Sequence, residues 1–224
     1  MLPALLALTL TAAPGYDEGR TALEARRLEL AKGWKRDKQG TRSAARQALL
    51  DYVDEVAFPS WSGTQWAFYG TTTTPREGAI ACGYFVTTVL EQASFKLERV
   101  KLAQQASAYL VSTLARGTKV EWLRPKDSAS ALASMRQAFP EAKLLVVGFD
   151  LHVGFVRLEG ARASFCHSSY LEPGVMTCEE PVAAGAFASS LYVVGDALND
   201  AVLDDWVLGR EVPSVLPKRS TPRG

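Results

Sequence analysis

The first half of the chain carries hydrophobic residues at helical spacing. The clearest case is residues 41–57, where apolar side chains recur three and four positions apart between Leu49 and Val56. Thr41 is a candidate N-cap for this helix, and Phe58-Pro59 marks its predicted end. We also predict helices over 17–32, 80–92, 98–115 and 127–138, the last of them capped by Asp127.

The second half of the chain changes to a period of two. This alternation predicts strands over 144–149, 151–158, 162–168 and 191–194. Because the helices come first and the strands follow, the order predicts an α+β fold with an antiparallel sheet.

The two ends of the chain differ from the part between them. Residues 1–15 form an apolar, uncharged stretch that ends in small residues, which is typical of an export signal. A charged helical lead-in or linker is expected over 16–40, a catalytic domain over 41–210, and a basic, proline-rich flexible tail over 211–224. The expected location is therefore periplasmic or secreted.

Composition narrows the range of partners. The 224 residues include 25 basic and 24 acidic side chains, for a net charge of +1. Such a balance argues against binding to nucleic acid or to an anionic membrane surface. No apolar run is long enough to cross a bilayer, so we expect no stable membrane insertion after the signal is removed. We also expect no cofactor.

The chain has three cysteines, an odd number. Cys166 and Cys178 flank a segment with a Pro-Gly turn signal, and in an oxidising compartment they could form a disulfide. The other interpretation is that both are small buried residues. Cys82 is then the odd thiol. It lies in the first turn of the helix predicted over 80–92, where free backbone N–H groups and the helix dipole favour the thiolate.

Only two histidines are present, and both fall in the strand region. A two-residue turn at Gly160-Ala161 would place His152 and His167 on one face of a hairpin, on a diagonal. Gly154 between them has no side chain to intrude, and Cys166 points to the other face. An imidazole base needs one ring nitrogen free and the other hydrogen-bonded, and this layout supplies both.

At this point the residues resemble a family. A WSGTQW loop, then IACGYF at a helix start, HVGFV on a strand and CHSS on the next strand are similar to the NlpC-like branch of the papain-like cysteine peptidases and amidases. The resemblance covers about 60–170. It implies a papain-like fold with the nucleophile helix packed on an antiparallel sheet, and assigns catalysis to Cys82, His152 and His167. It further implies substrate contacts by Gln65 and Trp66.

The expected activity is cleavage of an amide bond, with a peptide or a peptidoglycan fragment as substrate. The family's usual D-C-S-G-F is here Ala81-Cys82-Gly83-Tyr84-Phe85, without the Asp or the Ser, and helices at 98–138 are inserted between nucleophile and base. These departures leave the substrate and the choice between hydrolysis and acyl transfer open.

Two other interpretations use the same residues. One is a non-catalytic envelope-binding module that contacts its partner through the aromatic loop 61–69. The other is a zinc site made by Cys82, His152 and His167, but the chain has no close ligand pair such as CxxC or HExxH, so no metal is predicted.

Overall fold

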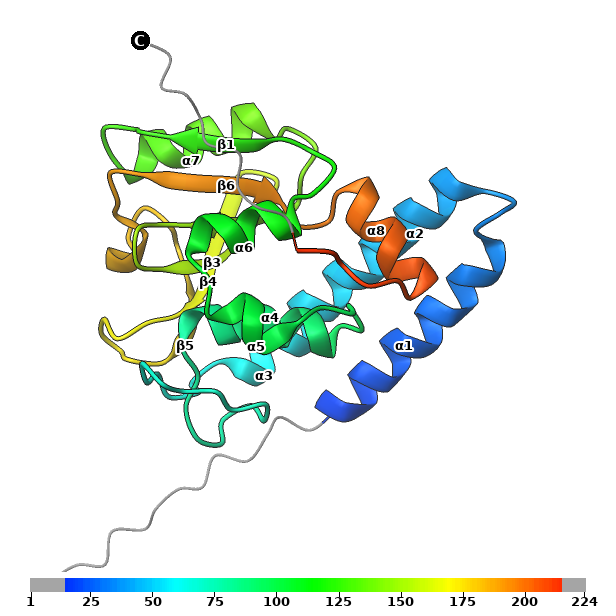
Figure 1. Cartoon of the computed structure of the whole chain (residues 1–224). Helices are drawn as coiled ribbons and strands as arrows, with labels where there is room; N and C mark the ends of the chain where they lie inside the picture. Colours follow the sequence, from blue (N-terminus) through cyan, green and yellow to red (C-terminus); the bar gives the residue numbers. More distant parts are fainter. Residues whose placement is uncertain (1–14, 215–224) are drawn as a thin grey trace, which may run out of the picture.

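The computed structural model describes residues 15–214. The predicted export signal up to residue 14 and the predicted tail from residue 215 lie outside the described residues. The described chain is a mixed α+β structure in which helices pack on a six-stranded antiparallel sheet (Figure 1). The α+β prediction is therefore confirmed at this level.

The sheet has the strand order β1-β6-β2-β3-β4-β5, and every neighbouring pair is antiparallel. The four predicted strands are present with small shifts of their ends. The edge strands β1 and β5, each four residues long, were not predicted. The bounds are β1 Val120–Leu123, β2 Leu144–Gly148, β3 Val153–Glu159, β4 Arg162–Ser168, β5 Met176–Glu179 and β6 Tyr192–Asp196.

The helix predicted over 41–57 is longer at both ends. It begins as α2 (Lys38–Tyr52), with the Asp37 side chain rather than that of Thr41 accepting the capping hydrogen bond, from the N–H of Gly40. A π-helical turn, η1 (Val53–Ala57), then leads directly into α3 (Phe58–Trp61). Pro59 lies in the first turn of α3, where its missing N–H costs little, so the chain stays helical beyond the predicted end.

The charged lead-in is a helix, α1 (Tyr16–Gly33), and it belongs to the same body as the rest. Tyr16, Leu23 and Leu30 are buried in the main core. The Tyr16 hydroxyl accepts a hydrogen bond from Trp61 Nε1 at 2.9 Å and donates to Gln92. A linker would be solvated on all sides, so the boundary expected at residue 41 does not separate two structural units.

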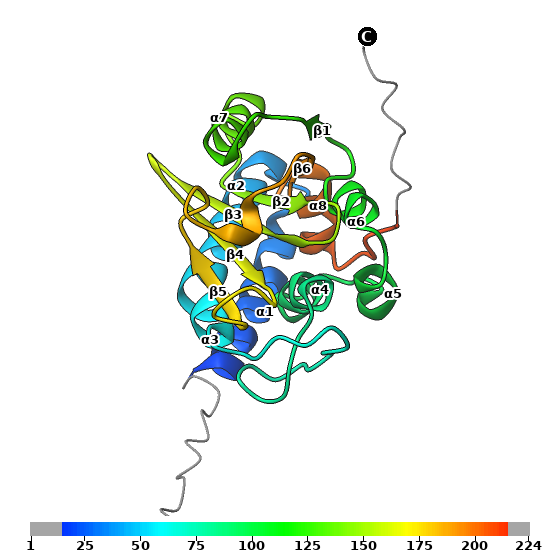
Figure 2. The same cartoon turned by 90° about the vertical axis from the view of Figure 1, so that its left-hand side faces the viewer.

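The remaining helices surround the sheet (Figures 1 and 2). The helix predicted over 98–115 is two short helices, broken by a turn at 104–106. Asp127 caps the next helix as predicted, by accepting from the N–H of Ser130. The last helix was not predicted. The bounds are α4 Cys82–Gln92, α5 Arg99–Ala103, α6 Ser107–Leu114, α7 Ser128–Ala138, a 3₁₀ turn η2 Gly185–Phe187 and α8 Asp200–Leu208.

Both faces of the sheet are covered, which explains the run of buried residues along β2. Leu144 and Val146 face a core shared with α1, α2, α4, α6 and α8. Leu145 and Val147 face a second core that includes α7 and η2. Alternate residues of each strand thus enter different cores, and a one-residue shift of register would exchange them.

Two findings complete the description of the fold. Val212, in the predicted flexible tail, is buried, and its N–H donates to the carbonyl of Lys96, so the described start of that tail is fixed to the body. No helix within residues 15–214 is long and apolar enough to cross a membrane.

Cys166 and Cys178 form a disulfide between β4 and β5, where they are direct cross-strand partners. A bridge that closes a loop of this length contributes roughly 3 kcal/mol to stability in the loop-entropy treatment. We therefore expect reductant to lower the free energy of unfolding by about 3 kcal/mol, measured by urea denaturation. A Cys166→Ala/Cys178→Ala variant should not respond to reductant. If reduction of both sulfurs leaves the urea midpoint unchanged, this expectation is wrong.

Candidate active site

The segment that leads into Cys82 is fixed from two sides. The N–H of Ile80 donates to the carbonyl of Gln65, and the N–H of Ala81 donates to that of Gly70, each at 2.9 Å. From the sheet, the buried hydroxyl of Ser168 donates to the Ile80 carbonyl at 2.7 Å. Because Cys82 follows directly, these bonds set the position of its side chain.

Cys82 is the first residue of α4, so its own N–H and the next N–H groups have no partner within the helix. Gly83 follows, and a Cβ at this position would lie 2.4 Å from the carbonyl oxygen of Ala103 in α5. The helix α5 therefore packs directly on the backbone of the first turn of α4. A serine at residue 83, as in the family pattern, does not fit beside this helix.

The β3–β4 hairpin has the predicted register. Phe155 pairs with Cys166 and Glu159 with Arg162, and Gly160 has a φ of 57°, as a two-residue turn with a leading glycine requires. A Cβ at Gly154 would lie 2.9 Å from the Cβ of His167. Only glycine leaves this space open.

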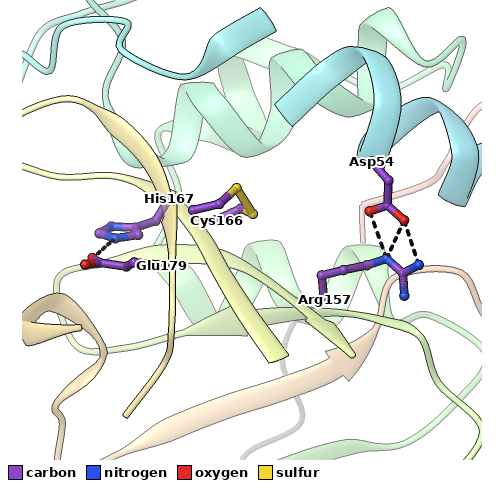
Figure 3. The surroundings of a disulfide bond; sticks show 6 residues. Asp54, Arg157, Cys166, His167 and Glu179 are labelled. Carbon is purple, nitrogen blue, oxygen red and sulfur yellow. Dashed lines mark hydrogen bonds and ion pairs between the residues drawn. A yellow bond between two sulfur atoms is a disulfide. The ribbon is translucent and has the colours of Figure 1, made fainter. Parts of the chain in front are cut away.

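The two imidazoles are hydrogen-bonded to each other, from His152 Nε2 to His167 Nδ1 at 3.0 Å. His167 Nε2 is in turn 2.9 Å from Glu179 Oε1 on β5, as Figure 3 shows. We call His152, His167 and Glu179 the imidazole–carboxylate chain. His152 lies in the turn before β3, and its Nδ1 is the ring nitrogen that the chain leaves free.

Aromatic rings surround both imidazoles. Phe165 stacks on His167 with 4.2 Å between ring centroids, and Phe149 stacks on His152 at 5.9 Å. Burial, together with His167, lowers the pKa of His152 to about 3. Burial also lowers the pKa of His167, although the Glu179 carboxylate acts in the opposite direction. Both rings are therefore neutral at pH 7, and His152 is in the form that can accept a proton.

The pKa of Cys82 moves against the prediction. Burial raises it, and the nearby backbone N–H groups of Gly83, Val153 and Cys82 itself only partly oppose this shift. The helix terminus acts in the predicted direction, but loss of hydration is the larger effect. The resting pair is thus a thiol and a neutral imidazole rather than a thiolate and an imidazolium.

Cys82 and His152 line one cavity of about 160 Å³ at the end of the sheet. The inserted helices form its other wall through Ala103, Ala106 and Ser107. Pockets for drug-sized ligands measure roughly 300–1,000 Å³, so this cavity accommodates only a small group beside the sulfur.

The predicted substrate-binding residues do not share this cavity. Among the described residues that line it, neither Gln65 nor Trp66 is present. Gln65 instead fixes the backbone of Ile80, and Trp66 packs on Tyr170 with 5.6 Å between centroids. Of the other loop aromatics, Trp61 is fully buried, whereas a neighbouring pair is exposed to solvent, Phe68 and Tyr69.

Glu179 was missed by the sequence reasoning, although a signal for it existed. If Cys166 and Cys178 are taken as a cross-strand disulfide, His167 pairs with Thr177 and Phe165 with Glu179. Glu179 then lies on the face of His167, one diagonal step away. The disulfide is on the opposite face of the sheet (Figure 3).

No group of three or more His, Cys, Asp or Glu side chains within residues 15–214 is arranged to hold a metal ion. The comparisons with protein families, with curated proteins and with solved structures find no match for this chain.

The raised pKa of Cys82 gives a testable pH dependence. Alkylation requires the thiolate, so the rate with iodoacetamide should keep increasing above pH 8.5, the approximate pKa of a free cysteine. No plateau is expected between about pH 5 and pH 8. Cys82→Ser should not be labelled, because the other two cysteines are bonded to each other. A plateau in the acidic range would reveal a thiolate–imidazolium pair and contradict this assignment.

Proposed function

We propose that this protein is an exported cysteine hydrolase with Cys82 as nucleophile and His152 as general base. The observation that carries the proposal is the shared cavity of Cys82 and His152, with the other His152 nitrogen hydrogen-bonded to His167. A nucleophile, a base and a group that orients the base form the usual constellation for acyl transfer. The α4 helix on an antiparallel sheet is compatible with the proposed papain-like fold.

The proposed reaction begins at the carbonyl carbon of an amide. The Cys82 sulfur attacks this carbon while His152 Nδ1 takes the thiol proton, and the N–H of Cys82 stabilises the oxyanion. The intermediate then collapses to a thioester as the imidazolium protonates the leaving nitrogen. Water, deprotonated by His152, attacks the thioester and releases the acid and the free thiol.

A neutral thiol is compatible with this sequence of steps. His152 is unprotonated over the whole neutral range, so it can remove the proton as the sulfur attacks.

The substrate class we propose is a peptide or a cell-wall peptide fragment with a small acyl group at the scissile bond. The small volume of the cavity supports the size of this group, and export would bring the enzyme to the periplasm or the medium.

The two histidines should contribute unequally. His152→Ala should lower the rate on the order of 10²–10⁴-fold, because it removes the base. His167→Asn keeps a polar partner for His152 and should retain measurable activity, whereas His167→Ala should retain less. The readout is the release of p-nitrophenol from p-nitrophenyl acetate, with the acetyl adduct located on Cys82 by mass spectrometry and circular dichroism as the folding control.

Two outcomes would change the assignment. If His167→Asn is as inactive as His152→Ala, both rings act directly on the substrate. If neither histidine matters and Cys82 is not acetylated, the proposal fails, and a binding module that uses the exposed Phe68 and Tyr69 replaces it.

The cavity wall formed by Ala103, Ala106 and Ser107 should limit access of substrate to the Cys82 sulfur. Ala106 is exposed at the cavity and has an extended backbone, so Ala106→Trp fits the fold and narrows the entrance. We expect kcat/KM for p-nitrophenyl acetate to fall at least about tenfold, which corresponds to roughly 1.4 kcal/mol of transition-state binding. Ala183→Trp, at an exposed alanine outside the cavity, is the matched control. Equal kcat/KM values for Ala106→Trp and Ala183→Trp would show that substrate does not reach Cys82 past Ala106.

A further inference from the structure

Glu179 is the one member of the imidazole–carboxylate chain that has no assigned role so far. Its side chain is 35% exposed, whereas that of His167 is 2% exposed, so the chain runs from the solvent side of β5 into the protein. Glu179 does not line the cavity of Cys82, and therefore it can act on the reaction only through the two histidines.

The positions of the protons follow from the carboxylate end. A carboxylate has no proton to donate, so His167 Nε2 must carry the hydrogen of the bond to Glu179. A neutral imidazole has one N–H, which leaves His167 Nδ1 as an acceptor. His152 Nε2 must then donate across the 3.0 Å contact, and His152 Nδ1 keeps its lone pair.

The opposite order of protons would block the reaction. If His167 Nδ1 donated to His152 Nε2, the hydrogen of His152 would sit on Nδ1, and this nitrogen could not accept the thiol proton. Without a carboxylate at the end of the chain, both orders form one imidazole–imidazole hydrogen bond of similar quality. Burial of the His167 ring makes either bond costly to break, so the choice between the two orders rests on the end group.

We propose that Glu179 is a positioning residue that holds both histidines as their Nε2–H tautomers and thereby keeps His152 Nδ1 ready to accept a proton. The catalytic part of this inference rests on the proposed function, whereas the tautomers themselves do not. The carboxylate has a second effect, because its negative charge stabilises the positive charge that the two rings acquire when His152 accepts a proton.

The fold supplies Glu179 with a fixed position. The disulfide joins Cys166 to Cys178, the residues next to His167 and Glu179 in their strands. His167 also stacks on Phe165, the cross-strand partner of Glu179, at an interplanar angle of 13°. These contacts keep ring and carboxylate in hydrogen-bond geometry without a contribution from the substrate.

The experiment is long-range ¹H–¹⁵N NMR of protein labelled on histidine nitrogens. The chain has two histidines, so the spectrum contains two imidazoles, and a His152→Ala variant assigns them. The wild-type protein is compared with Glu179→Gln, whose amide can donate as well as accept at the same position. Glu141→Gln is the matched control, because it removes an exposed carboxylate that belongs neither to the cavity nor to the imidazole–carboxylate chain.

We expect both wild-type imidazoles to be Nε2–H tautomers, and Glu179→Gln to show a mixture in which Nδ1 of each ring is partly protonated. The pKa of His167 should fall further in this variant, because the carboxylate that raises it is gone. Hydrolysis of p-nitrophenyl acetate should fall roughly 10- to 100-fold, the range found when a partner that orients a metal-binding imidazole is removed. The control should match the wild type in tautomers, titration and rate.

An Nδ1–H tautomer of His152 in the wild type overturns the proposal. So do unchanged tautomers in Glu179→Gln. Neither result depends on turnover, so loss of the proposed function would be seen separately, as a wild-type protein that is not acetylated on Cys82. If Glu179→Gln shifts the tautomers but its hydrolysis rate equals that of the wild type, the positioning role is likewise excluded.

Discussion

The hydrogen bond between the partly buried imidazole of His152 and the buried imidazole of His167 is the contact on which the rest of the site depends. Phe165 stacks on His167, which is buried, so this ring cannot exchange the bond for one to water without a large loss. The bond fixes one nitrogen of each ring, and thereby determines what the other nitrogen can do. The second nitrogen of His167 is hydrogen-bonded to Glu179, and His152 lines the cavity together with Cys82.

The proposed nucleophile, Cys82, and the proposed base, His152, come from different layers of the molecule. Cys82 starts a helix that packs on the same side as the disulfide, whereas His167 points into the core on the other face of the sheet. His152 joins the two layers because it precedes β3, at the end of the sheet. This placement explains why His152 lines the cavity with Cys82, whereas His167 contacts His152 by a hydrogen bond and does not line the cavity.

The sequence predicted what depends on near neighbours in the chain. A turn with glycine first sets the β3–β4 register, and this local rule placed both histidines on one face. Alternation alone could not show that β5 brings Glu179 to them, because a four-residue edge strand has too little of it to be recognised, and only the pairing of Cys166 with Cys178 carried that signal. The prediction that the helix start favours the thiolate of Cys82 was wrong for a related reason. The helix terminus is a local feature, whereas the burial that raises the pKa of Cys82 is produced by distant segments.

Gly83 and the short helix packed on it have a consequence for how this protein could change over time. The wall facing the sulfur belongs to α5, α6 and their turn, whereas His167 and Glu179 belong to the sheet and His152 directly precedes β3. Substitutions in the wall can alter which molecules enter the cavity while the imidazole–carboxylate chain stays unchanged. Introducing a larger residue at position 83 would require that wall to move first. In the proposed enzyme, substrate selectivity and catalytic chemistry are therefore open to separate selection, although a larger residue at position 83 could follow only after a change in the wall.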